Sequence, residues 1–145
     1  MPTVQDILSV KGNTVHYVAV GTTVLSATRL MNEHGIGALV VTEDDRVVGM
    51  FTERDVLRRV VAEERDPAQC RVGDVMTDRV ACCRPETEIS EARSVLKNHR
   101  IRHLPVINED GQLLGMISIG DLNAYDADGR EATIFLLQEY LYGRT

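Results

Sequence analysis

The sequence predicts an α/β protein of the α+β type, built from two copies of a β-α-β-β-α unit and followed by a C-terminal helix. The first observation is an internal repeat, in which residues 22–55 align on residues 87–121 with one inserted residue, Gly111. The second is the order of hydrophobic periods, because each copy has a helical pattern followed by two apolar runs that an acidic turn separates. The third is the length of 145 residues with 43% apolar side chains, which suits one compact domain or two very small ones.

The elements of each copy follow from these periods. A short extended segment comes first, at residues 16–20 in the first copy and 80–83 in the second. Residues 23–34 predict a helix, because apolar side chains recur there at helical spacing and Thr22 or Thr23 can cap the first turn. Residues 38–51 predict a hairpin of buried strands, which residues 103–117 repeat around a stronger Asp110-Gly111 turn signal. The first copy closes with a helix at residues 53–64, whose expected buried stripe is Val56, Leu57, Val60 and Val61.

Turn signals and composition also predict the domain boundaries. Residues 1–66 are expected to form the first repeat with an N-terminal helical lead-in, and Asp66-Pro67 ends it. Residues 67–79 are a linker and the entry to the second repeat, which spans residues 80–128. Residues 129–145 predict a C-terminal helix that either caps the core or packs on another chain, with apolar positions Ile134, Phe135, Leu137 and Leu141.

The charge balance excludes several classes of partner. Sixteen basic residues against 22 acidic ones give a net charge of −6, whereas nucleic-acid-binding domains are usually strongly basic. The same charge disfavours an anionic membrane surface, and no apolar run is long enough to cross a bilayer. The start of the chain has no secretory leader pattern, so we expect a cytoplasmic protein. Its cysteines lack the spacing of a metal site and are expected to be reduced and buried, at Cys70, Cys82 and Cys83.

The candidate chemistry lies where each hairpin ends, in the stretches GMFTERD (49–55) and GMISIGD (115–121). A hydroxyl and a carboxylate three residues apart open a helix in both copies, which is typical of a capping box. That box prefers Glu or Gln, and the shorter Asp in both copies favours a carboxylate that faces outward. A helix start attracts phosphate and a carboxylate can accept two hydrogen bonds from a ribose diol, so the alternative is a nucleotide site. Spacing alone leaves both interpretations open.

Arginines gather near these stretches. Fourteen of the 16 basic residues are Arg, whose planar group binds phosphate oxygens in pairs. The competing explanation for Arg58 and Arg59 is simple pairing with Glu63 or Glu64 on one helix. The candidate phosphate-binding residues around the two motifs are Arg54, Arg58, Arg59, Arg100, Arg102 and His103.

The duplicated unit that ends in Gly-apolar-apolar-Thr/Ser-x-x-Asp closely resembles the CBS domain, named for cystathionine β-synthase. The stretches that carry the resemblance are IGALVV with RVVGMFTERD (36–55) and IRHLPVINEDGQLLGMISIGD (101–121), and VGDVMT (72–77) resembles the usual entry to a second CBS copy. Two such copies in tandem form a Bateman module. The resemblance covers about residues 4–125, so we expect a stand-alone CBS pair.

The resemblance implies a pseudo-twofold pair of repeats with two clefts between them that bind AMP, ADP, ATP or NAD(H), and sometimes S-adenosylmethionine. Asp55 and Asp121 would hold ribose hydroxyls, and Thr52 and Ser118 would contact phosphate or ribose. The backbone at 37–38 and 102–103 would meet the adenine edge. Arg54 aligns with Gly120, so we expect the two sites to differ in affinity or ligand. The expected ligand-binding residues are Gly37, Ala38, Thr52, Arg54, Asp55, Arg58, Arg102, His103, Ser118 and Asp121.

The function that follows is an adenine-nucleotide sensor without catalysis, for which no cofactor or metal is required. Nucleotide binding would change the conformation of a homodimer and thereby the surface seen by an effector protein. One alternative is a structural dimerisation module with vestigial ligand sites. The other is a nucleotide-processing enzyme, although the four histidines are accompanied by no catalytic triad order or phosphate-binding loop.

Overall fold

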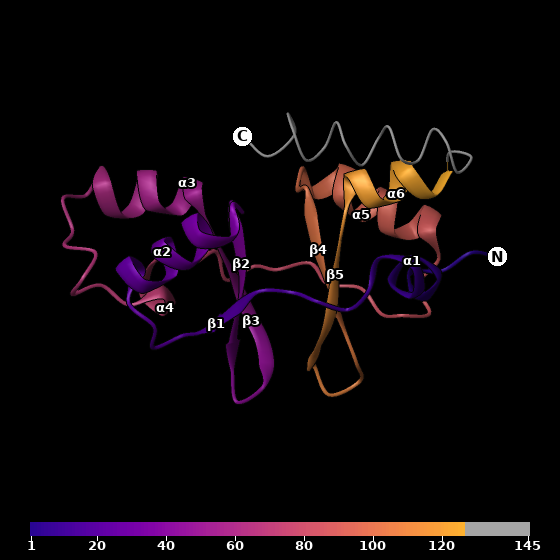
Figure 1. Cartoon of the computed structure of the whole chain (residues 1–145), viewed down its shortest axis with the longest axis horizontal. Helices are drawn as coiled ribbons and strands as arrows, with labels where there is room; N and C mark the ends of the chain where they lie inside the picture. Colours follow the sequence, from indigo (N-terminus) through magenta and orange to yellow (C-terminus); the bar gives the residue numbers. More distant parts are fainter. Residues whose placement is uncertain (127–145) are drawn as a thin grey trace. The chain divides into compact units, whose positions relative to one another are not determined.

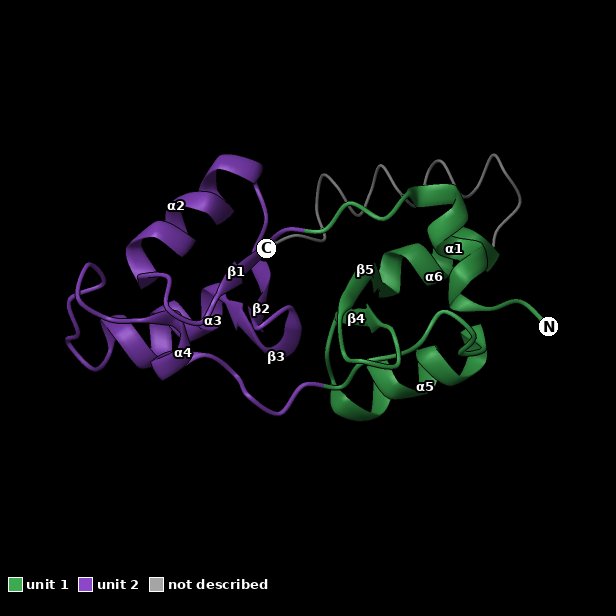
Figure 2. Ribbon diagram, turned by 90° about the horizontal axis from the view of Figure 1, so that it is seen from below, with its two compact units in different colours: residues 1–15, 81–145 green, residues 16–80 purple. Residues whose placement is uncertain are grey.

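The computed structural model describes residues 1–126, and the helix expected at residues 129–145 lies outside this range (Figure 1). The chain forms two compact units (Figure 2). The first-repeat unit is His16–Val80, and the second-repeat unit joins Met1–Val15 to the residues from Ala81 onward. The α+β class and the two repeats are confirmed, since each unit packs helices against a small sheet.

The first-repeat unit is built around a three-stranded sheet in the order β1-β2-β3. The strand β1 runs parallel to β2, and β2 pairs antiparallel with β3. Its helical segments are two α-helices, one short α-helical turn and one π-helix. The elements in chain order are β1 (Tyr17–Ala19), α2 (Val24–His34), β2 (Ala38–Glu43), β3 (Arg46–Thr52), α3 (Glu53–Asp55), η1 (Val56–Val61) and α4 (Val72–Val75).

Local signals explain α2 and the hairpin that follows it. The Thr23 hydroxyl accepts a hydrogen bond from the Ser26 amide at 3.2 Å, which caps the start of α2. Gly35 ends the helix in the left-handed region, at φ 63°. The β2–β3 turn has positive φ at two successive residues, Asp44 and Asp45, as a tight hairpin of twisted strands requires.

The helix expected at residues 53–64 differs from the prediction. Only Glu53–Asp55 is α-helical, and Val56–Val61 continues as a π-helix. The wider turn changes the angular spacing of side chains, so an apolar stripe counted at 3.6 residues per turn no longer faces one way. Val60 is buried, whereas Leu57 and Val61 are 63% and 62% exposed. The prediction of a buried stripe was therefore wrong for Leu57 and Val61.

The second-repeat unit repeats this arrangement with a two-stranded sheet of β4 and β5. The extended segment expected at residues 80–83 is reduced to one parallel bridge between Cys83 and Val106, where β1 lies in the first-repeat unit. Two backbone hydrogen bonds of 2.9 Å hold Cys83 there, to Pro105 and Ile107. The elements in chain order are α1 (Val4–Lys11), α5 (Ile89–His99), β4 (His103–Ile107), β5 (Leu113–Ser118) and α6 (Ile119–Asp126).

The segments that precede the two repeats, residues 1–15 and 67–80, are called lead-ins below. Neither lead-in packs with the repeat that the sequence predicts for it. The helix α1, expected with the first repeat, buries Val4, Ile7 and Leu8 in the core of the second-repeat unit. The expected linker at residues 67–79 lies in the first-repeat unit and buries Val72 and Val75 in its core. Turn signals show where a chain changes direction, but they do not show which core the next apolar residues join.

Matching hydrogen bonds show that the lead-ins are equivalent. The Val4 amide donates to Thr87 O at 2.9 Å, as the Val72 amide donates to Thr22 O at 2.8 Å. Gln5 and Gly73, the next residues of the two lead-ins, likewise donate to Pro85 and Val20. Each repeat is thus completed by the segment that precedes the other repeat in the sequence.

Gly49 is required on β3, where Met76 and Thr77 of the 67–80 lead-in approach the strand closely. A Cβ placed at Gly49 would lie 2.8 Å from the Thr77 carbonyl oxygen and 2.5 Å from Met76 Sδ. The Thr77 backbone is fixed there by two hydrogen bonds of 2.9 Å to Met50, so it cannot easily retreat. A Cβ at the equivalent Gly115 would lie 3.0 Å from the end of the Leu8 side chain and 3.8 Å from the Asn13 backbone.

We expect Gly49→Ala to lower the free energy of unfolding by about 1–3 kcal/mol, because it overpacks a fixed backbone contact. Gly115→Ala is the matched control, and its cost should be smaller because a side-chain end can shift. Urea denaturation of both variants measures the difference. Equal losses would contradict a role for the close approach at Thr77.

Candidate functional site

The two helix starts that carry the motif, at α3 and α6, share the same local hydrogen-bond geometry. The Thr52 amide donates to Asp55 Oδ2 at 3.0 Å, and the Asp55 amide donates to Thr52 Oγ1 at 3.3 Å. The corresponding distances for Ser118 and Asp121 are 2.8 and 3.1 Å. Both starts therefore form a capping box, and each Asp completes it although the box prefers Glu or Gln.

Strand pairing brings the other expected site residues to the same starts. In the hairpin registers, Ala38 lies opposite Thr52 and His103 lies opposite Ser118. The first amide of each helix donates to the carbonyl just before the first strand of the hairpin, from Glu53 to Gly37 at 3.0 Å. The second-repeat unit has the same bond from Ile119 to Arg102, at 3.1 Å. Each unit thus gathers its own half of the predicted set, while Arg54 and Arg58 are exposed on α3 and η1.

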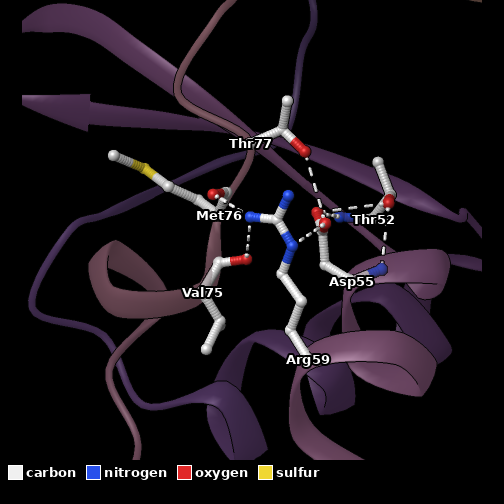
Figure 3. Close-up of polar contacts among 6 residues, drawn as sticks. All are labelled: Thr52, Asp55, Arg59, Val75, Met76 and Thr77. Atoms are coloured by element: carbon white, nitrogen blue, oxygen red, sulfur yellow. Dashed lines mark hydrogen bonds and ion pairs between the residues drawn. The ribbon is translucent and has the colours of Figure 1, made fainter.

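Asp55 is the centre of a polar network in the first-repeat unit (Figure 3). Its side chain is only 6% exposed, and both carboxylate oxygens have partners. Oδ2 accepts from the Thr52 amide and hydroxyl, and Oδ1 accepts from the Thr77 hydroxyl at 3.2 Å. Arg59 Nε lies 3.7 Å from Oδ1, so the buried carboxylate has a cation beside it.

Arg59 also ties η1 to the lead-in segment. Its Nη1 donates to the carbonyl oxygens of Val75 and Met76, at 3.3 and 2.8 Å (Figure 3). The sequence offered pairing with Glu63 or Glu64 as one explanation for Arg59, whereas the structure pairs it with Asp55. The spacing of four residues between Asp55 and Arg59 is the signal that identifies this pair.

Asp121 has a different cation. Lys11 Nζ, at the end of α1, lies 2.7 Å from Asp121 Oδ2 and donates to the Met116 carbonyl at 2.9 Å. The side chain of Asp121 is 12% exposed and that of Lys11 is 34% exposed. Sequence reasoning missed Lys11 and Thr77, because both belong to lead-ins assigned to the other repeat. An alignment of residues 4–11 on 72–79 is the signal that could have found them.

The three cysteines are free thiols. Cys70 and Cys83 are buried and Cys82 is partly buried, and none of the three forms a disulfide. Burial raises the pKa of Cys82, and burial together with the neighbouring Cys82 raises the pKa of Cys83 to about 12. The thiolates of Cys82 and Cys83, which are the reactive form, are therefore rare at neutral pH.

We expect Cys83 to resist alkylation in the folded protein. Its thiolate fraction at pH 8 should be about 1000-fold lower than that of an ordinary cysteine, because its pKa is higher by about three. Mass spectrometry after iodoacetamide treatment at pH 8, with and without urea, measures this. Equal labelling rates in both conditions would contradict the burial of the thiol.

Within residues 1–126, no three His, Cys, Asp or Glu side chains are grouped to hold a metal ion. A search of the same residues finds no helix with the length and hydropathy needed to span a membrane.

Comparisons with known proteins identify the family. The CBS domain family matches residues 4–62 and 72–128. A CBS-domain protein from Burkholderia ambifaria MC40-6 has a TM-score of 0.78 at 42% identity, over 87% of this chain and 95% of that one. The structure of CBSX2 in complex with AMP has a TM-score of 0.72 at 27% identity, over 86% of this chain and 96% of that one.

Curated relatives are longer than the matched region. The mitochondrial CBS domain-containing protein CBSX3 of Arabidopsis thaliana is 36% identical over 83% of this chain. The chain spans 62% of that protein, and 65% and 47% of relatives from Acidianus ambivalens and Methanopyrus kandleri. With both repeats matched and both motif starts formed, the chain belongs to the CBS-domain family and carries two CBS domains in tandem.

Proposed function

We propose that this chain is a regulatory module that binds an adenine nucleotide and has no catalytic activity. The observation that carries the proposal is the duplicated helix start. At each start a hydroxyl and a largely buried carboxylate lie beside the first strand of the hairpin. A carboxylate in this position can accept hydrogen bonds from both hydroxyls of a ribose. The AMP complex of the relative CBSX2 supports an adenine nucleotide as the ligand class.

The roles proposed for individual residues follow the motif. Asp55 and Asp121 are the candidates for the ribose hydroxyls, with Thr52 and Ser118 contacting ribose or phosphate. Arg54 and Arg58 are candidates for phosphate in the first-repeat unit. The backbone at Gly37, Ala38, Arg102 and His103 is the candidate for the adenine edge. AMP, ADP, ATP and NAD(H) share the adenosine group that these residues would recognise.

The proposed output is a change of conformation in a homodimer. A ligand shifts a conformational equilibrium only as far as its affinities for the two states differ. The nucleotide would therefore bind one arrangement of the dimer more tightly, and an effector protein would read the changed surface. A cytoplasmic location is part of this proposal.

A structural dimerisation module is the second candidate, and the capping boxes favour it. Each carboxylate already accepts the amide of its own N-cap residue, so the motif also has a purely structural use. The two candidates differ in whether a ligand stabilises the fold.

Thermal melts with AMP, ADP, ATP and NAD test the proposal. A ligand present at 100 times its dissociation constant adds about 2.7 kcal/mol to the stability of the native state, which raises the melting temperature by about 5–10 °C. No rise with any of the four would leave the structural module as the function. ATP that stays intact during a long incubation supports the absence of catalysis, and turnover would contradict it.

A further inference from the structure

The two motif carboxylates take their cations from different places. Arg59 lies four residues after Asp55 on the helix that the motif opens. The equivalent position after Asp121 is Tyr125, which has no charge. The second-repeat unit takes its cation from the lead-in helix α1 instead, as Lys11.

The carboxylate in the first-repeat unit has partners on both of its oxygens within that unit. Both oxygens of Asp55 accept hydrogen bonds, and the guanidinium of Arg59 is anchored on two backbone carbonyls. A ribose at this start would have to share Oδ1 with the Thr77 hydroxyl and the Arg59 guanidinium. This network is therefore a clamp between the helix start and the lead-in.

The carboxylate in the second-repeat unit keeps acceptor capacity. Within residues 1–126, the Asp121 side chain accepts two hydrogen bonds, from the Ser118 amide and from Lys11 Nζ, and Oδ2 accepts both. Oδ1 is left to accept from a ligand hydroxyl. Lys11 makes two hydrogen bonds to residues of this range, and an ammonium has three N–H donors.

The charge of Lys11 matters for a ligand that carries phosphate. An ionised carboxylate that holds a ribose repels the phosphate of the same nucleotide, because both are anions and the site is partly screened from water. Lys11 cancels the charge of Asp121 and has a donor left for a ligand oxygen. The Lys11 side chain is also partly exposed.

We propose that Lys11 is a specificity-determining residue of the second-repeat site, which it makes selective for a phosphate-bearing nucleotide over the uncharged nucleoside. This inference rests on the proposed nucleotide function. It adds a residue outside the motif to the site, and it assigns the ligand to the Asp121 start rather than to the Asp55 clamp.

Calorimetric titration of the full chain with AMP and with adenosine tests the inference. We expect Lys11→Met to weaken AMP binding by about tenfold, the loss of roughly one charge-assisted contact, and adenosine binding by less than about twofold. Lys97→Met removes the other lysine, which is exposed on α5, and should change neither affinity. Lys11→Arg should restore most of the preference for AMP, because it restores the charge.

The outcomes separate this inference from the function on which it rests. If wild-type protein binds AMP and Lys11→Met leaves the ratio of AMP to adenosine affinity unchanged, the inference is wrong and the proposed function stands. Tighter binding of both ligands by Lys11→Met would also overturn it, since Lys11 would then block Asp121. If wild-type protein binds neither ligand, both the function and the inference fail. A melting curve of Lys11→Met shows that the variant is folded in each case.

Discussion

Asp121→Ala is expected to weaken AMP binding by on the order of 100-fold. The substitution removes the acceptor for two ribose hydroxyls, and hydrogen bonds to a charged group contribute about 1.5 kcal/mol or more each. It also removes the partner of Lys11, which stays partly exposed and can be hydrated. Titration calorimetry of the wild type and the variant measures the change.

Two further variants make this result specific. Asp110→Ala removes an exposed acid from the β4–β5 turn of the same unit and should leave the AMP affinity unchanged. Asp55→Ala should leave it within about threefold, because the clamp already uses both oxygens of that carboxylate. If Asp55→Ala abolishes AMP binding and Asp121→Ala preserves it, the ligand binds at the Asp55 start. That result would contradict the assignment to Asp121.

Leu8→Ala is expected to lower the free energy of unfolding by about 2–5 kcal/mol. Leu8 is buried on α1 among residues of the second-repeat core, and removing a buried leucine loses its burial and leaves a cavity. A loss of this size is a large share of the stability of a small domain. Urea denaturation measures it.

Val10→Ala is the matched control for Leu8→Ala, because Val10 lies on the same helix and is exposed. Its effect on the free energy of unfolding should stay within about 0.5 kcal/mol. If the two variants unfold at the same urea concentration, α1 does not belong to the second-repeat core, and the exchange of lead-ins would be contradicted.

The elements with local signals could be predicted from the sequence. The helix α2 has an N-cap and a C-terminal glycine within its own segment, and each hairpin carries its own turn residues. The second repeat has the hairpin signal again at Gly111, whereas α5 has Glu88 at its N-cap without a side-chain hydrogen bond and Arg100 at its C-cap. The motif residues gather for the same reason, since the hairpin register alone places Ala38 opposite Thr52 and His103 opposite Ser118.

The features that depend on distant residues could not be predicted in this way. The assignment of α1 to the second-repeat unit rests on its packing against β5 and α6, which lie at the far end of the described residues. Lys11 was missed with it, although it lies 2.7 Å from a residue that the motif identifies. The exposure of Leu57 and Val61 follows from a π-helical hydrogen-bond pattern that the apolar period does not reveal.

The binding of AMP at the Asp121 start can be tested by a crystal structure of the full chain grown with AMP. We expect AMP at the start of α6, with its ribose hydroxyls at a hydrogen-bonding distance of about 2.5–3.0 Å from the carboxylate of Asp121. Crystals grown at saturating AMP that show no nucleotide at this start would contradict this site.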